Sequence, residues 1–167
     1  MIAVSDSTPM IYLSKLGKLH YLKSLFKNIF ITKEVFAEVV LKGKEQNKKE
    51  IASIEEAIEE KFIVVKSVMK KINMLNLGEG ELTSLSLCKE LKIKNLLIDD
   101  NEGYAAANLI EIIPIRTTTL LIILLDKKLI NFEEYKESLI RLSEKGYFLS
   151  AEVYEKLLGV GRNISHL

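Results

Sequence analysis

The sequence is short of the residues and motifs on which several classes of protein depend. Its single cysteine, Cys88, excludes an internal disulfide. The longest uncharged apolar run, LLIILL at residues 120–125, is far shorter than the roughly 20 residues that span a bilayer. No charged-then-apolar leader opens the chain. These absences predict a cytoplasmic protein.

Two phosphate-binding motifs are missing as well. A Rossmann dinucleotide site needs a GxGxxG turn after the first strand, where this chain has SDSTPM, and a P-loop is equally absent. The two histidines, His20 and His166, stand apart from every motif. A zinc site built on histidine and cysteine is therefore disfavoured.

The composition is that of a globular chain with almost no net charge. Hydrophobic residues make up 48% and charged residues 28% of the 167 residues, which suits one domain with a real core. Lys and Arg number 24 against 23 Asp and Glu, so the formal net charge of +1 neither favours nor excludes a nucleic-acid partner. The basic segments, KGKEQNKK and Lys66 with Lys70 and Lys71, can bind RNA backbone or form solvated surface.

Short apolar segments alternate with helical patterns along the chain. Uniformly apolar strands separated by helices indicate a parallel sheet covered on both faces. We therefore predict an α/β fold, a three-layer α/β/α sandwich with a central parallel sheet of about five strands. The expected strands are 2–4, 28–31, 62–65, 95–98 and 112–115.

Helical periodicity fills the intervals between these strands. No linker, repeat or low-complexity tract interrupts the pattern. It predicts a single domain over residues 1–167, with a C-terminal helical extension from about residue 131. The expected helices lie between Pro9 and Leu25 with a break near Gly17, after Thr32, from Ile51 to Ile58, and at 79–91, 102–110, 118–125, 132–145 and 151–158.

Acidic residues gather where the strands of the predicted sheet end. Functional groups of open parallel sheets collect at the carboxyl ends of the strands. A cluster of carboxylates there needs a counter-charge, because each raises the pKa of its neighbours. Mg²⁺ or Mn²⁺ takes oxygen ligands and can activate water, which favours metal-assisted phosphodiester hydrolysis. If the first and fourth strands are neighbours, the converging residues are Asp6, Glu38, Glu79, Glu81, Asp99 and Asp100.

Each acidic residue also has a purely structural explanation. Asp6 can cap the helix that follows it, and Glu38 can be a solvated helix residue. A helix N-terminus favours the acids of segment 79–81 by roughly 0.3–1 kcal/mol. The doublet at 99–100 can supply a helix cap and a turn residue. These explanations do not account for the gathering of all the acids at one end of the sheet.

Four segments, taken jointly and in order, resemble the PIN-domain nucleases: VSDSTPMIYLSKLG, ITKEVFAEVV, LGEGELTSLSL and LLIDDNEGYAAA. The similarity covers nearly the whole chain and is closest to a PIN-like branch of unassigned function that is related to VapC-like toxins. The resemblance implies an α/β/α sandwich that cleaves RNA with Mg²⁺ or Mn²⁺. It also implies a homodimer and, for a toxin, a small antitoxin-like partner.

The resemblance assigns site residues by position. The third acid of the family pattern falls on Glu81, with Glu79 as the alternative, and the fourth falls on either Asp99 or Asp100. The implied catalytic set is Asp6, Glu38, Glu81, Asp99 and Asp100, of which all but Glu38 would hold metal.

The chain departs from the family pattern at two places. Glu81 stands where the toxins usually have Asp, and Arg116–Thr117 stands where the branch often has Gly-Thr. Arg116 can contact a phosphate or crowd the pocket. These departures favour the alternative function, a non-catalytic PIN-like module that binds RNA or protein.

Overall fold

The computed structural model describes residues 1–46, 48–74 and 76–165, so His166 lies outside the described residues. The chain divides into two units, Met1–Arg116 and Thr117–Leu167. The expectation of a single domain with an extension from about residue 131 stays a prediction. In the described part of the chain, no helix is long and apolar enough to cross a membrane.

The strands described for the first unit form one parallel sheet, in the order β3-β2-β1-β4-β5. The first and fourth strands are therefore neighbours, and Ser5 at the end of β1 pairs in register with Leu97 at the end of β4. This is the adjacency on which the convergence of the acidic residues depends. The strands are β1 (Ile2–Ser5), β2 (Asn28–Thr32), β3 (Ile63–Lys66), β4 (Asn95–Leu97) and β5 (Ile113–Ile115).

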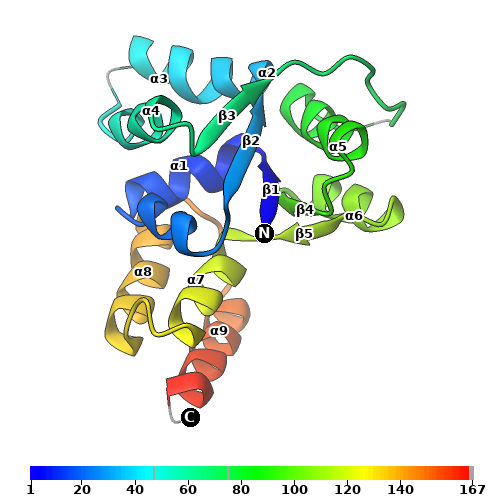
Figure 1. The fold of residues 1–167 in the computed structure, drawn as a ribbon. Helices are drawn as coiled ribbons and strands as arrows, with labels where there is room; N and C mark the ends of the chain where they lie inside the picture. The colour runs from blue at the N-terminus through cyan, green and yellow to red at the C-terminus, as the bar shows by residue number, and fades with distance from the viewer. Residues whose placement is uncertain (47, 75, 166–167) are drawn as a thin grey trace. The chain divides into compact units, whose positions relative to one another are not determined.

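Helices cover both faces of this sheet, which confirms the predicted three-layer α/β/α sandwich. In Figure 1, α1, α3 and α4 lie on one side of the strands, and α5 and α6 lie on the other. The helices of this unit are α1 (Ser7–Lys15), the 3-10 helix η1 (Leu19–Ser24), α2 (Lys33–Phe36), the π-helical turn η2 (Ala37–Leu41), α3 (Lys42–Glu45), α4 (Ile51–Glu59), α5 (Glu79–Leu91) and α6 (Asn101–Leu109).

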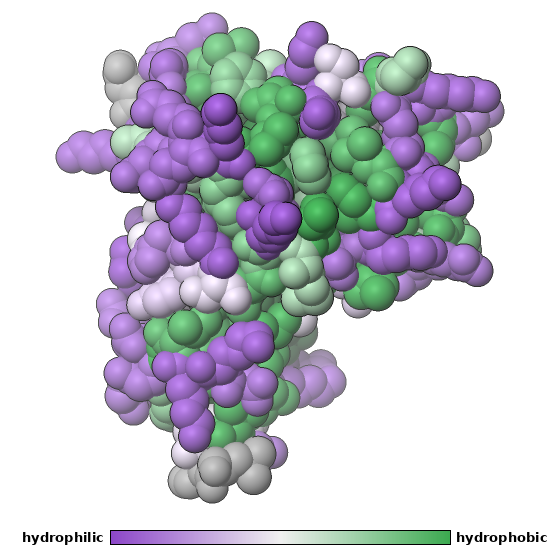
Figure 2. All heavy atoms as spheres, viewed as in Figure 1, coloured by the Kyte–Doolittle hydropathy of each residue, from purple (hydrophilic) through white to green (hydrophobic). Residues whose placement is uncertain are grey.

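Local sequence signals place these helices. Thr32 caps α2, because its Oγ1 accepts a hydrogen bond from the Val35 N–H at 3.2 Å. Helix α4 is amphipathic and buries Ile51, Ile54 and Ala57. Figure 2 shows mainly hydrophilic side chains over the outer surface of α3 and α4, as this pattern predicts.

A buried apolar cluster fixes α5 and α6 against the sheet. Val4 of β1 and Leu96 of β4 pack with Leu85 of α5 and Ala107 of α6, and all of them are fully buried. Burying one leucine side chain stabilises a fold by roughly 1.5–3 kcal/mol. This packing holds the first turns of α5 and α6 at the carboxyl edge of the sheet.

The second unit, in its described part, consists of α7 (Thr117–Asp126), α8 (Phe132–Glu144) and α9 (Ala151–Ser165). The apolar helix α7, which contains LLIILL, packs against both α8 and α9. Helix α9 runs to Ser165 rather than the expected 158. Gly161 weakens the helical pattern there, but a Cβ at this position would lie 2.5 Å from Cε1 of Tyr135, so the glycine lets α9 approach that ring.

Candidate active site

Asp6 is a buried carboxylate at the carboxyl end of β1, with 4% of the residue exposed. Its backbone N–H donates to the Leu97 carbonyl at the end of β4 (2.9 Å). Although Asp6 is the N-cap residue of α1, its side chain accepts no capping hydrogen bond from the described residues, so the capping explanation is wrong. Within residues 1–46, 48–74 and 76–165, no group hydrogen-bonds its Oδ1. A buried oxygen without a partner is uncommon and points to a missing ion or ligand.

Burial and neighbouring carboxylates shift the pKa of Asp6. Burial raises the pKa of Asp6 to about 7. The Ser7 backbone N–H opposes this shift of the pKa, whereas three acidic neighbours add to it: Glu38, Glu81 and Asp99. Charges shift a pKa in this way at short range. The structure therefore brings four of the predicted carboxylates together at the carboxyl edge of the sheet.

The first turn of α5 packs directly against two of these carboxylates. A Cβ on Gly80 would lie 3.0 Å from Asp6 Oδ1 and 3.3 Å from Glu38 Oε2. The turn is held in place through Thr83, whose Oγ1 lies 3.0 Å from that of Thr32 at the end of β2. The positive end of the α5 dipole thus faces the carboxylates and partly offsets their repulsion.

Glu79 and Glu81 share this turn but have different surroundings. Glu79 forms an ion pair with Lys71, in which both side chains are exposed. Glu81 accepts a hydrogen bond from the Gly78 N–H through Oε2 (2.9 Å). Burial raises the pKa of Glu81, the Gly78 N–H lowers it, and nearby acids raise it again: Asp100, Glu102 and Glu38. Glu81 therefore lies among the other carboxylates, and Glu79 is paired at the surface.

Asp99 and Asp100, the acidic doublet after β4, also have different surroundings. Asp100 is the N-cap of α6, and its Oδ1 accepts hydrogen bonds from the N–H groups of Glu102 (2.8 Å) and Gly103 (2.9 Å). Asp99 is half-buried, and its charge contributes to the raised pKa of Asp6. Burial raises the pKa of Tyr12, and the charge of Asp99 adds to this shift. The charge of Asp99 thus raises the pKa of Asp6, which follows β1, and of Tyr12 in α1, whereas Asp100 Oδ1 caps α6.

The chain is similar to one family of known proteins. A family model described as a PIN domain matches residues 2–161, which extend over both units. The chain belongs to the PIN-domain family. It therefore has the nuclease-type fold of that family. Searches of curated proteins and of solved structures found no significant match.

PIN domains generally use divalent metal ions, and this PIN domain has carboxylates where such an ion could bind. The grouped side chains offer carboxylate oxygens, which Mg²⁺ and Mn²⁺ prefer, and Asp6 Oδ1 lacks a partner among the described residues. Across those residues, however, no three or more His, Cys, Asp or Glu side chains form a group that could hold a metal ion. Mg²⁺ is commonly held by one or two carboxylates, with water and substrate phosphates completing its shell. The residues therefore fit a cation with few protein ligands, not a closed cage.

The structure places one further acid at this edge, Glu34, which was not among the predicted residues. Glu34 lies in the first turn of α2, and its Oε2 is buried with no hydrogen bond to any residue that the structure describes. The hydrogen bond with Glu79 raises the pKa of Lys71, and the charge of Glu34 adds to that shift. The signal that could have identified Glu34 is its place two residues after the end of β2, on the edge where Asp6 follows β1. Lys71, from the basic segment, is thus engaged with acids here.

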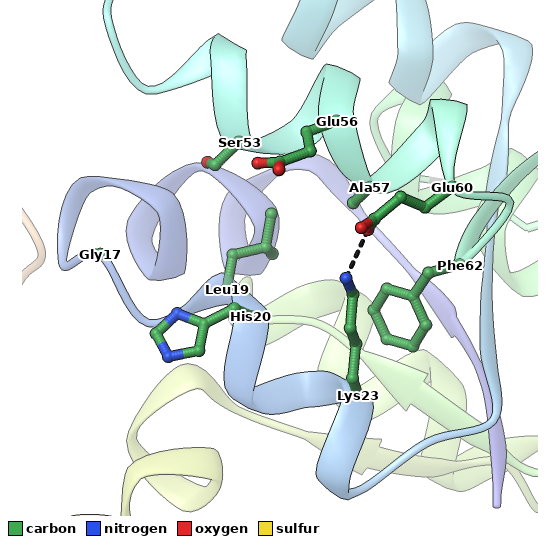
Figure 3. A pocket seen from close by; sticks show the side chains of 9 residues that line it. All are labelled: Gly17, Leu19, His20, Lys23, Ser53, Glu56, Ala57, Glu60 and Phe62. Atoms are coloured by element: carbon green, nitrogen blue, oxygen red, sulfur yellow. Dashed lines mark hydrogen bonds and ion pairs between the residues drawn. The ribbon is translucent and has the colours of Figure 1, made fainter.

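A separate pocket of about 160 Å³ lies elsewhere on the first unit (Figure 3). It is beyond the C-terminal end of α1, whereas Asp6 precedes the N-terminal end of that helix. Lys23 pairs with Glu60 there, and its Nζ lies 6.0 Å from the centre of the Phe62 ring. His20 also lines this pocket. The charges of Lys23 and Glu60 offset each other. The carboxylates grouped around Asp6 lie at the other end of the sheet.

Proposed function

We propose that this PIN domain is a Mg²⁺- or Mn²⁺-dependent ribonuclease that hydrolyses RNA phosphodiester bonds. The observation that carries the proposal is the buried Asp6 carboxylate, which has acidic neighbours and an Oδ1 without a hydrogen-bond partner among the described residues. Such an arrangement opposes folding unless a counter-charge joins it. Strongly shifted pKa values of this kind gather at functional sites. A divalent cation would supply the counter-charge.

Each acidic residue has a distinct role in this proposal. Asp6, Glu81 and Asp99 would hold the cation directly or through water. When bound, the cation would offset the negative charge of the scissile phosphate and make a water molecule more acidic. Glu38, which is exposed, would orient the attacking water and accept its proton. Asp100 would fix the start of α6, which its Oδ1 caps, and leave contact with the cation to Asp99.

A non-catalytic module that binds RNA or protein is the second candidate. Two observations favour it. Among the described residues no group of three metal-ligating side chains forms, and Arg116 lies against Asp99, where its Nη1 donates to the Asp99 carbonyl. Metal binding does not separate the two functions, because a site without catalysis can still bind a cation. Turnover does separate them.

The test is cleavage of a mixed RNA pool by purified protein in Mn²⁺, in Mg²⁺ and in EDTA. Asp6→Asn is compared with Asp126→Asn, a matched change of an exposed aspartate at the end of α7. We expect cleavage that requires metal, disappears in Asp6→Asn and persists in Asp126→Asn. Cleavage by Asp6→Asn at the wild-type rate would overturn the assignment. A wild-type protein that cleaves no RNA in either metal would favour the binding module.

We further propose that the ribonuclease acts in the cytoplasm as the toxin of a toxin–antitoxin pair, as a homodimer with a small antitoxin-like partner. The support is the PIN fold together with the resemblance to VapC-like toxins. Induced expression in a bacterial host should then stop growth for the wild type and not for Asp6→Asn. Equal growth of the two strains, at equal protein levels, would argue against a toxin. Analytical ultracentrifugation of the purified protein tests the homodimer.

A further inference from the structure

A positively charged side chain is fixed beside the acidic residues, at the carboxyl end of β5. The guanidinium of Arg116 donates from Nη1 to the Asp99 carbonyl (2.6 Å) and from Nη2 to Asn101 Oδ1 (2.8 Å). Its Cζ lies 4.5 Å from the centre of the Tyr104 ring, within the range of a cation–π contact. All three partners belong to the β4–α6 turn or to α6. The guanidinium is therefore held in one orientation.

The contacts that hold Arg116 leave its charge available. Within the described residues, the groups that hold it are a backbone carbonyl, an amide oxygen and an aromatic ring, none of which carries a negative charge. A guanidinium also carries more N–H groups than these two hydrogen bonds use. The residue is half-buried, so one side of it is open to a ligand.

The surroundings indicate which anion would bind there. The carboxylates of Asp6, Glu81 and Asp99 repel a small free anion, and the formal net charge of only +1 attracts it little. An RNA strand that reaches these carboxylates needs a fixed cation beside them to hold its own phosphates. The planar fork of an arginine matches the oxygens of a phosphate group. The position of Arg116 meets this need.

We propose that Arg116 binds an RNA phosphate adjacent to the one that is cleaved, with Tyr104 as the residue that positions it. The proposal rests on the proposed ribonuclease function, because it assigns the phosphate to the same strand that enters the carboxylate site. It also chooses between the two roles that the sequence left open for Arg116. The residue that departs from the family pattern supplies substrate binding.

A purely structural role for Arg116, as a brace of the β4–α6 turn, makes a different prediction. A brace contributes to thermal stability and leaves the salt dependence of RNA binding unchanged. A phosphate contact with a single strand contributes about 0.7 to the slope of log affinity against log salt concentration. The slope therefore distinguishes the two roles.

The experiment is fluorescence anisotropy with labelled single-stranded RNA, in EDTA, over a series of salt concentrations. We expect Arg116→Ala to weaken binding roughly tenfold at low salt and to lower the slope by about 0.7. Arg116→Lys should retain the slope and bind several-fold more weakly, since an ammonium group lacks the planar fork. Tyr104→Leu should weaken binding by roughly two- to fivefold. Melting temperatures check that each variant is folded, and the lysine and leucine variants decide the question if Arg116→Ala does not fold.

The chain offers a matched control in a second cation–aromatic pair. Lys18 Nζ lies 5.7 Å from the centre of the Tyr21 ring, beyond the C-terminal end of α1 and away from the carboxylates. Lys18→Ala and Tyr21→Leu should leave the affinity and the slope unchanged. Wild-type affinity and slope in Arg116→Ala would overturn the inference, as would a wild-type protein that binds no RNA. Since binding is measured without metal, Arg116-dependent binding with no cleavage in Mn²⁺ or Mg²⁺ would overturn the ribonuclease function alone.

Discussion

The Oδ1 atom of Asp6 lies 3.0 Å from the point where a Cβ on Gly80 would stand. The end of β1 and the first turn of α5 therefore meet with no room for a side chain between them. Glu38 Oε2 lies 3.3 Å from the same point. The spacing of these carboxylates is thus set by a helix backbone, which cannot adjust by changing a rotamer. The acidic site depends on a glycine that carries no chemistry of its own.

Gly80→Ala should therefore impair cleavage while the fold remains intact. The added methyl group must displace Asp6 Oδ1 or Glu38 Oε2 by a few tenths of an ångström, and small misplacements of catalytic groups are costly. We expect the RNA cleavage rate to fall roughly tenfold, with a melting temperature close to that of the wild type. The measurement is initial rates in Mn²⁺ together with thermal unfolding.

A second glycine provides the control for this change. Gly159 lies in α9, and a Cβ there would have no described atom within 4 Å. Gly159→Ala should leave cleavage unchanged and raise the free energy of unfolding by up to roughly 1 kcal/mol, because alanine favours helix. Equal cleavage by wild type and Gly80→Ala would show that the close approach has no part in catalysis.

Asp6 should make the stability of the metal-free protein depend on pH. Its pKa is raised from 3.8 to about 7 in the folded chain, mainly by burial. The folded state therefore favours the protonated form, and the stability from this preference is complete below about pH 4 and lost as pH rises through about 7. Asp6→Asn has no proton to lose, so it should become more stable than the wild type across this interval, by up to roughly 4 kcal/mol. Urea unfolding in EDTA, from pH 4 to pH 8, measures the difference. A constant difference over that range would contradict the prediction.

The sequence predicts those site residues whose positions are set by the end of a strand. Asp6 follows β1 directly and Asp99 follows β4 after Ile98, so a parallel sheet with neighbouring β1 and β4 brings them to one edge. Glu79 and Glu81 were harder to separate, because residues two apart on a helix lie roughly 200° apart around its axis. The sequence does not show how far α5 is rotated against the sheet, and that rotation decides which of the two faces the acids.

Interactions between elements that are distant in sequence escaped prediction for a similar reason. The position of Arg116 over Tyr104 depends on β5 lying next to β4 and on the start of α6, which no local pattern specifies. Glu34 was overlooked because a glutamate in the first turn of a helix already has a local explanation. The burial of its Oε2 becomes apparent only with the tertiary structure.

The two glutamates of the α5 turn should respond differently to the same substitution. Glu81→Gln should lose most RNA cleavage, because it removes a charge that acts on Asp6, while its amide oxygen can still accept the Gly78 N–H. Glu79→Gln removes only an exposed ion pair with Lys71, of a kind worth roughly 0–1 kcal/mol. We expect near wild-type cleavage from Glu79→Gln, measured as initial rates in Mn²⁺. Faster cleavage by Glu81→Gln than by Glu79→Gln would instead assign the catalytic role to Glu79.

Substitutions can distinguish the two residues of the acidic doublet, because Asp100 caps α6 whereas the charge of Asp99 raises the pKa of Asp6. Asn is as good a helix cap as Asp, so Asp100→Asn should keep both the hydrogen bonds to α6 and the stability of the fold. Asp100→Ala should lose about 1 kcal/mol of unfolding free energy with the cap. Asp99→Asn should retain stability and lose cleavage, since the charge of Asp99 acts on Asp6. Urea unfolding and initial cleavage rates on the same preparations give both quantities. If Asp100→Asn lost as much cleavage as Asp99→Asn, the capping residue would itself be part of the catalytic centre, and both carboxylates of the doublet would then have to face the cation.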